Sequence, residues 1–291
     1  MKNNFYISLL LGTIILCFVS LLIELPFGVN WDPNFIFWMF LSNFLITILL
    51  ALLIKKNILN GIKLSVVIFL IYFIIGNFNI LIEAYIFNVT DRNETIVLLL
   101  KGLVLAIIIS PVFVFLFRKW KSDDTRLAFE PRSIFQWVWR IVVADLLYLV
   151  FYILAGFILY TVYPQLMDFY GDKVPDFSLM INTQFFRALL FIGIALIISR
   201  TVNASFFYNA LLVGAVFSVI GGIAPLIVPG DEIMPAYIRF GHAFEVGISN
   251  FIYGFILTYL VGQKTISPEA SNAVKKPVLK SQILLFFKFK S

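Results

Sequence analysis

An apolar stretch near the end of the chain carries four residues that could do proton or ligand chemistry. It reads RFGHAFEVGISNF and contains Arg239, His242, Glu245 and Asn250. Histidine changes its charge near neutral pH, and a carboxylate three residues away on a helix can pair with it. Arginine and asparagine side chains on the same face supply donors for an anionic or zwitterionic group. The stretch therefore predicts a proton-handling, ligand-binding helix face.

Ionisable residues of both signs occur in other apolar segments as well. Glu83 continues a stripe formed by Tyr72, Gly76 and Asn79 at spacings of four and three residues, so these four positions share one helix face. Charged groups in a bilayer face the interior of the bundle and pair with one another. We therefore expect three acids and three cations to form a nearly neutral set. They are Glu24, Glu83, Glu245, Lys101, Arg187 and Arg239.

Two interpretations of this set are open. In one interpretation, the charges form internal ion pairs that fix the register of the helices. Alternatively, they line an outward-facing polar pocket, because intramembrane ionisable residues mark substrate or proton paths. The expected substrate-binding residues of that pocket are Glu83, Lys101, Arg187, Arg239, His242, Glu245 and Asn250.

Catalysis is a competing hypothesis for the same residues. His242 and Glu245 form half of a metal-ligand set, but the chain has one histidine and lacks an HExxH motif, so we expect no metal and no cofactor. Ser249 lies on the same helix as His242, a rigid arrangement for a catalytic dyad. The alternative is therefore a membrane-embedded enzyme that acts on a lipid or lipid-linked substrate through His242 and Glu245. The leading hypothesis is a proton-linked transporter or sensor of a small polar or anionic solute, and a structural membrane partner with purely internal ion pairs is a third alternative. Whether the protein is an enzyme stays open at this point.

The composition decides the class of protein that positions these residues. Hydrophobic residues make up 61% of the chain, 33 residues are Phe, and only 13% are charged. Soluble domains have about a quarter of their residues charged. The lipid bilayer is therefore the expected partner, and a small polar or anionic ligand is a second one. The net charge of +6 is explained by loop lysines and arginines, so we expect no nucleic-acid partner.

The apolar runs have the length of transmembrane helices. A hydrocarbon core about 30 Å thick needs about 20 apolar residues per crossing, and eight runs meet this length. They are Phe5–Leu25, Phe35–Ile54, Ile62–Phe87, Thr95–Phe117, Trp137–Val162, Asn182–Ser199, Phe206–Val228 and Ala236–Val261. The predicted fold class is all-α, a polytopic membrane helix bundle of about eight transmembrane helices. We divide the chain into one transmembrane domain, residues 1–262, and a basic, largely disordered cytoplasmic tail, residues 263–291.

Basic residues indicate the orientation of the bundle. Lysine and arginine accumulate in cytoplasmic loops. Sixteen of the 22 lie at the two termini and in alternate loops, whereas the opposite loops hold only Arg92 and Lys173. Both termini are therefore predicted to be cytoplasmic, and Glu83, His242 and Glu245 to lie in the outer half. The composition suggests a multi-pass protein of the plasma membrane, specifically a bacterial inner membrane.

Two further features lie along the predicted helices. Asp145 lies in the inner half of the fifth run, where it is either a structural hydrogen-bonding group or part of a proton path. Gly221, Gly222 and Pro225 interrupt the seventh run, which predicts either a proline kink or an unwound segment beside a cavity. The oligomeric state does not follow from the sequence.

Overall fold

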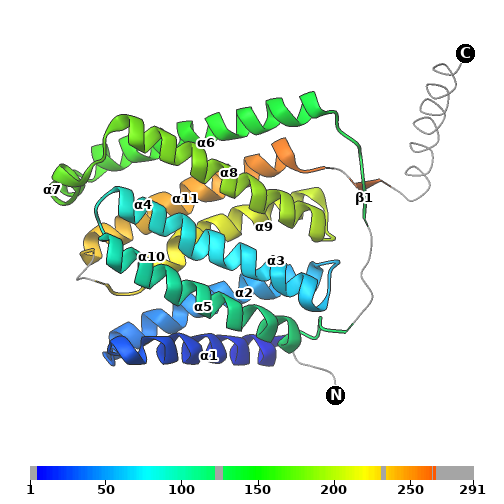
Figure 1. The fold of residues 1–291 in the computed structure, drawn as a ribbon, viewed down its shortest axis with the longest axis horizontal. Helices are drawn as coiled ribbons and strands as arrows, with labels where there is room; N and C mark the ends of the chain where they lie inside the picture. The colour runs from blue at the N-terminus through cyan, green and yellow to red at the C-terminus, as the bar shows by residue number, and fades with distance from the viewer. Residues whose placement is uncertain (1–4, 122–126, 231–233, 264, 267–291) are drawn as a thin grey trace, which may run out of the picture.

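The chain folds into a bundle of long helices in the computed structural model, which describes residues 5–121, 127–230, 234–263 and 265–266 (Figure 1). Within these residues, eight helices are long and apolar enough to cross a membrane. The predicted all-α polytopic bundle is therefore confirmed. The transmembrane elements are α1 (Phe5–Glu24), α2 (Pro33–Lys56), α3 (Gly61–Phe73) continued by η2 (Ile74–Phe78) and α4 (Asn79–Ile86), α5 (Arg92–Leu116), α6 (Ile134–Val162), α8 (Phe177–Thr201), α9 (Phe206–Ala215) continued by η4 (Val216–Ile223) and α10 (Ala224–Ile227), and α11 (Ala236–Val261).

The remaining elements are short and lie at the ends of the bundle. They are η1 (Leu25–Phe27), α7 (Gln165–Tyr170), η3 (Gly171–Lys173), β1 (Ala128–Phe129) and β2 (Thr265–Ile266). The two strands pair antiparallel over two residues each. Apart from positions 263, 265 and 266, the predicted tail of residues 263–291 lies outside the described residues.

Several helices begin earlier than their apolar runs. The α8 helix starts at Phe177, five residues before the predicted Asn182, because the Asp176 side chain accepts a hydrogen bond from the backbone N–H of Ser178. Ser133 and Gln136 likewise form a capping box at the start of α6. Polar caps satisfy the free N–H groups of the first turn. Hydropathy detects only the hydrocarbon-facing part of a helix, so it misses these polar first turns.

Glycines allow α11 to pack closely against α9 and η4. A methyl group on Gly254 would lie 3.0 Å from the Cα atom of Gly214, and one on Gly214 would lie 2.7 Å from the carbonyl oxygen of Phe251. Helices in membranes associate largely through van der Waals packing, which small residues at the interface strengthen. This contact fixes the position of α11, which carries the polar face identified in the sequence.

The two π-helical segments, η2 and η4, pack against each other in the middle of their spans. A methyl group on Gly76 would lie 3.0 Å from Cγ2 of Ile220, and one on Gly221 would lie 2.9 Å from Cγ2 of Ile75. The interruption predicted in the seventh run therefore takes the form of a π-helical stretch ahead of Pro225. Proline has no N–H for a regular helical bond, and a wider turn accommodates this loss.

The two ends of the bundle differ in character. The start of α1 and the end of α11 lie at the same end of the bundle (Figure 1). This end holds the loops rich in lysine and arginine, and we call it the inner end, following the predicted orientation. At the opposite, outer end, Tyr170 of α7 and Met234, two residues before α11, line the candidate site.

Candidate functional site

The polar face of α11 points into the bundle, as predicted. Arg239 and Asn250 are 6% and 7% exposed, whereas Phe244 and Ile248, on other sides of the same helix, are 73% and 47% exposed. Lipid therefore contacts the apolar faces of α11. The buried position of the polar face agrees with the high cost of placing charges against hydrocarbon.

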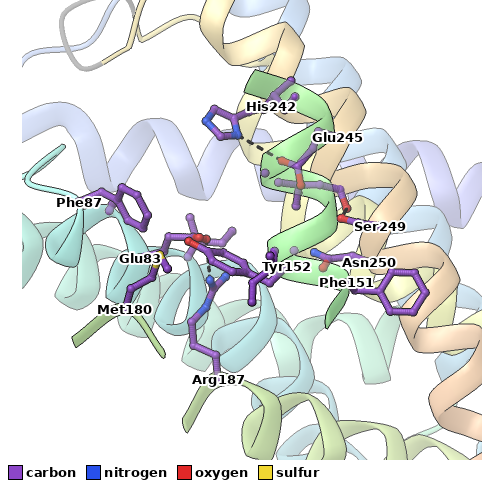
Figure 2. Close-up of a pocket in the computed structure, with 18 of the residues that line it drawn as sticks. Glu83, Phe87, Phe151, Tyr152, Met180, Arg187, His242, Glu245, Ser249 and Asn250 are labelled. Carbon is purple, nitrogen blue, oxygen red and sulfur yellow. Dashed lines mark hydrogen bonds and ion pairs between the residues drawn. The ribbon is translucent and has the colours of Figure 1, made fainter. Parts of the chain in front are cut away.

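A cavity of about 330 Å³ lies beside this face in the outer half of the bundle (Figure 2). Its walls come from α4, α6, α7, α8, η4, α10 and α11. Among the described residues that line it, the exposed ones belong to the outer part of α6, to the start of α8 and to the segment before α8. They are Ile153, Phe157, Val174 and Phe177. These exposed side chains place the opening of the cavity between α6 and α8.

The first ion pair in the wall joins α4 and α8. Nη1 of Arg187 lies 2.7 Å from Oε2 of Glu83. Arg187 also donates from Nε to Oδ1 of Asn79 at 3.0 Å and from Nη1 to Oε1 of Gln184 at 2.9 Å. Arg187 is only 4% exposed, whereas 31% of the Glu83 side chain is exposed. The carboxylate is thus the more accessible member of the pair.

The second ion pair belongs to α11. Nδ1 of His242 lies 3.4 Å from Oε2 of Glu245, a long contact that leaves room for a change of partner. The other ring nitrogen of His242, Nε2, is buried and has no hydrogen-bond partner among the described residues. A buried polar atom of this kind normally has a partner, so it marks a position where a ligand or water would bind.

Tyr170, on the short helix α7, contacts the His242 ring edge to face, with ring centroids 5.4 Å apart. Tyr170 lies outside the transmembrane segments and is buried. Burial, followed by the charges of Glu83, Tyr160 and Glu245, raises the pKa of its phenol. The phenol therefore stays protonated and neutral over the physiological range, so that His242 faces an uncharged aromatic ring.

An aromatic cluster closes the inner end of the cavity. The ring centroid of Tyr148 lies 5.2 Å from that of Phe191 and 5.0 Å from that of Tyr253. Tyr253 also donates a hydrogen bond from its hydroxyl to the carbonyl oxygen of Ala144 at 3.2 Å. The cluster separates the outer cavity from the inner half of α6, where the predicted second site, Asp145, has one buried carboxylate oxygen without a partner among the described residues.

The structure brings together five of the seven residues proposed from the sequence. Those that line the cavity are Glu83, Arg187, His242, Glu245 and Asn250. Lys101 lies elsewhere, where its Nζ pairs with Glu24 at 2.6 Å and stacks over the ring of Phe27. Arg239 donates to the carbonyl oxygens of Met234, Leu226 and Val228, so it holds the loop before α11 in place. We therefore leave Lys101 and Arg239 out of the candidate site.

Sequence reasoning missed the tyrosines on the α6 wall. Tyr148, Tyr152 and Tyr160 line the cavity together with Gly156, and all four are spaced four residues apart. This spacing places them on one helix face. The repeat was the signal that could have identified the wall, but phenols are common in membrane helices and carry no charge to draw attention.

Comparisons with protein-family models, with curated proteins and with solved structures give no match. Among the described residues, no three His, Cys, Asp or Glu side chains are grouped so that they could hold a metal ion.

Proposed function

We propose that this multi-pass membrane protein is a proton-linked transporter of a small solute, which binds in the outer cavity. The observation that carries the proposal is the presence of an ion pair, Glu83–Arg187, and a carboxylate–imidazole pair, Glu245–His242, in the wall of one cavity. Purely structural pairs have no need of open space beside them. Charged groups on a cavity inside a membrane are the usual components of substrate and proton paths.

The lining favours a solute with two kinds of groups. Most of the cavity surface is apolar, and nine of the lining residues are Phe or Tyr, so the lining suits an aromatic or aliphatic part of the solute. The two pairs leave the cavity nearly neutral, so a zwitterionic group, or an anionic group bound with a proton, adds no unpaired charge. Arg187 provides donors for a carboxylate, while the exposed oxygen atoms of Glu83 can accept from an amine.

Proton coupling is assigned to the pair on α11. A histidine side chain changes its charge near neutral pH, and His242 is the one histidine in the chain. The groups facing it are Glu245 from its own helix and Tyr170 from α7, while Glu83 and Tyr160 line the same cavity from α4 and α6. A bound carboxylate near Nε2 would favour the protonated ring, which couples solute binding to proton uptake.

A filled cavity tests the proposal directly. A Cβ atom added at Gly156 meets nothing within 4 Å, so Gly156→Phe should place its ring in the cavity without moving the helices. Gly193→Phe is the matched control, because Gly193 is also a helical glycine with open space around it but does not line the cavity. Both variants go into proteoliposomes that contain a pH-sensitive dye, and phenylalanine and phenylacetate serve as the first zwitterionic and anionic probes.

The expected result is solute-dependent proton movement for the wild type and for Gly193→Phe, and none for Gly156→Phe. Proton movement that is unaffected by Gly156→Phe would contradict the cavity as the site. The enzyme hypothesis makes a different prediction, since a lipid hydrolase or transferase would release product in detergent without any gradient. If product forms under those conditions and Glu245→Gln abolishes its formation, the enzyme hypothesis would replace the transport proposal.

A further inference from the structure

Three arginines gather at the inner end of the bundle, at the opposite end of the same helices that line the cavity. Arg132 lies just before α6, Arg140 two turns into it, and Arg200 in the last turn of α8. The guanidinium carbons of Arg132 and Arg200 lie 5.0 and 5.5 Å from the ring centroid of the same residue, Trp137. We call Arg132, Arg140 and Arg200 around Trp137 the arginine site.

The acceptors within the arginine site are mostly backbone carbonyl oxygens at the end of α11. Arg140 donates to the carbonyl oxygen of Leu260 at 2.8 Å, and Arg132 donates to those of Val261, at 2.9 Å, and Gly262. The end of a helix carries about half a negative charge. Among the described residues, the three positive charges therefore face this partial charge and the carboxylate of Glu130, which is less than their own total.

Among the described residues, no carboxylate forms an ion pair with these three arginines. The ion pairs that the described residues do form involve other side chains. Burial lowers the pKa of Arg132, and the positive charges of Arg140 and Arg200 lower it further. The negative charge of Glu130 acts in the opposite direction and raises it. The three arginines thus repel one another. An anion bound among them would remove this repulsion.

The site retains donors that could bind such an anion. Each guanidinium group has five N–H donors, and the three groups make four hydrogen bonds with described residues. Nε of Arg140 is buried and makes none of them. Guanidinium groups bind phosphate oxygens in a bidentate manner, so a phosphate is the anion that matches these free donors.

The surroundings of the arginine site are those of a membrane interface. Trp137 and Trp139 lie in the first two turns of α6, and tryptophan is enriched at the level of the lipid headgroups. Val138 and Val142, farther along α6 toward the outer end, are 53% and 50% exposed and form an apolar surface for acyl chains. A lipid whose tails lie against this surface would place its phosphate beside the arginines. We propose that the arginine site binds the headgroup of an anionic phospholipid from the leaflet at the inner end.

Capping of α11 explains only part of this arrangement. Arg132 and Arg140 satisfy carbonyl oxygens that the end of a helix leaves free, which is a structural role. Arg200 has no such role, because its hydrogen bond goes to the side chain of Gln263 at 3.0 Å and its own side chain is exposed. Arg200 is therefore the position at which lipid binding can be tested while α11 stays capped.

The test measures lipid binding by the full-length protein in detergent after removal of native lipid. Native mass spectrometry and thermal unfolding are followed during titration with dioctanoyl phosphatidylglycerol, with dioctanoyl phosphatidylcholine and with inorganic phosphate. The variants are Arg200→Gln, Arg200→Lys and, as a control with the same loss of charge at the outer end, Arg92→Gln. Arg92 is exposed at the start of α5.

We expect the wild type and Arg92→Gln to bind phosphatidylglycerol alike and to prefer it over phosphatidylcholine. Arg200→Gln should bind phosphatidylglycerol about five-fold more weakly, the factor for one basic residue beside an anionic surface, and Arg200→Lys should recover most of the loss. Equal binding by the wild type and Arg200→Gln, or an equal loss in Arg92→Gln, would overturn the proposal. Stabilisation by inorganic phosphate as strong as that by phosphatidylglycerol would assign the site to a soluble anion and overturn the lipid assignment.

Discussion

At the scale of single residues, the charged side chains inside the bundle differ in how much stability the protein would lose if their ion-pair partner were removed. Arg187 is almost completely buried, whereas Lys101 and its partner Glu24 lie at the rim, with 16% and 39% of their side chains exposed. A buried charge that loses its partner keeps its full desolvation cost. A partly exposed charge is solvated by water or headgroups instead. The two pairs therefore serve as a matched comparison.

Glu83→Gln should destabilise the protein much more than Glu24→Gln. The first change leaves Arg187 with only the neutral acceptors Asn79 and Gln184, and we expect it to lower the free energy of unfolding by about 3 kcal/mol. The second change should cost less than about 1 kcal/mol. Thermal unfolding in detergent measures both. If Glu83→Gln combined with Arg187→Gln costs as much as the two single changes added together, the two residues do not act as a pair.

Glu245→Gln should change the response to pH and leave stability almost unaltered. Glu245 makes its ion pair with His242 at the long distance of 3.4 Å, and its side chain is 17% exposed in the cavity wall. A neutral amide cannot stabilise the protonated histidine, so solute-dependent proton movement should be lost. The measurement is the proteoliposome assay, with the unfolding temperature as the control. A large fall in unfolding temperature together with unchanged proton movement would favour a structural role for the pair.

At the scale of elements, close contact between α11 and the α9–η4 segment fixes the cavity wall. Gly254→Ala should destabilise the bundle by about 1 to 3 kcal/mol, because its new methyl group would lie 3.0 Å from the Cα of Gly214 and 2.8 Å from Phe217. Gly193→Ala, in α8, meets nothing within 4 Å and should be neutral or should stabilise the helix by about 0.5 to 1 kcal/mol. Thermal unfolding compares the two. Equal effects would show that the helix crossing tolerates a wider separation.

The elements also show how far the sequence could predict this structure. Hydropathy located every span, and α11 begins and ends at the predicted Ala236 and Val261, because hydrocarbon thickness sets the length of an apolar run. The short helix α7 was missed, since its six residues carry no such constraint. Tyr170 reaches His242 from this helix. The position of Tyr170 in the site depends on tertiary packing, which neither the hydrophobic periodicity nor the amino-acid composition of the sequence reveals.

The same limit explains which charges were assigned correctly. Helical spacing placed Glu83, His242 and Glu245 on inward faces, and this was right because the cost of burial in lipid applies to each helix separately. The choice of partner depends on which helices are neighbours. The pairing of Lys101 with Glu24 follows from the position of α1 beside α5, and the sequence could not supply that position.

At the scale of the whole molecule, the two ends of the bundle have different chemistry. The outer half holds a cavity with balanced charges, and the inner end holds the arginine site and most of the basic loops. The aromatic cluster of Tyr148, Phe191 and Tyr253 lies between them. A transporter needs such a barrier on one side of its solute, and the cluster closes the cavity toward the inner end. Asp145 lies just beyond the cluster, next to Ala144, whose carbonyl oxygen accepts the hydrogen bond of Tyr253.

The orientation of the molecule can be tested with the one cysteine removed. In a Cys17→Ser background, the variant Asp172→Cys should react with a membrane-impermeant maleimide added to intact cells, whereas Lys56→Cys should not. Both positions are exposed, but Asp172 lies in the outer loop before α8 and Lys56 ends α2 at the inner end. Lysed cells should label both. Labelling of Lys56→Cys alone in intact cells would reverse the orientation, so that the cavity would open toward the cytoplasm. The arginine site would then face the outer leaflet, and the lipid headgroup that it binds would come from that leaflet.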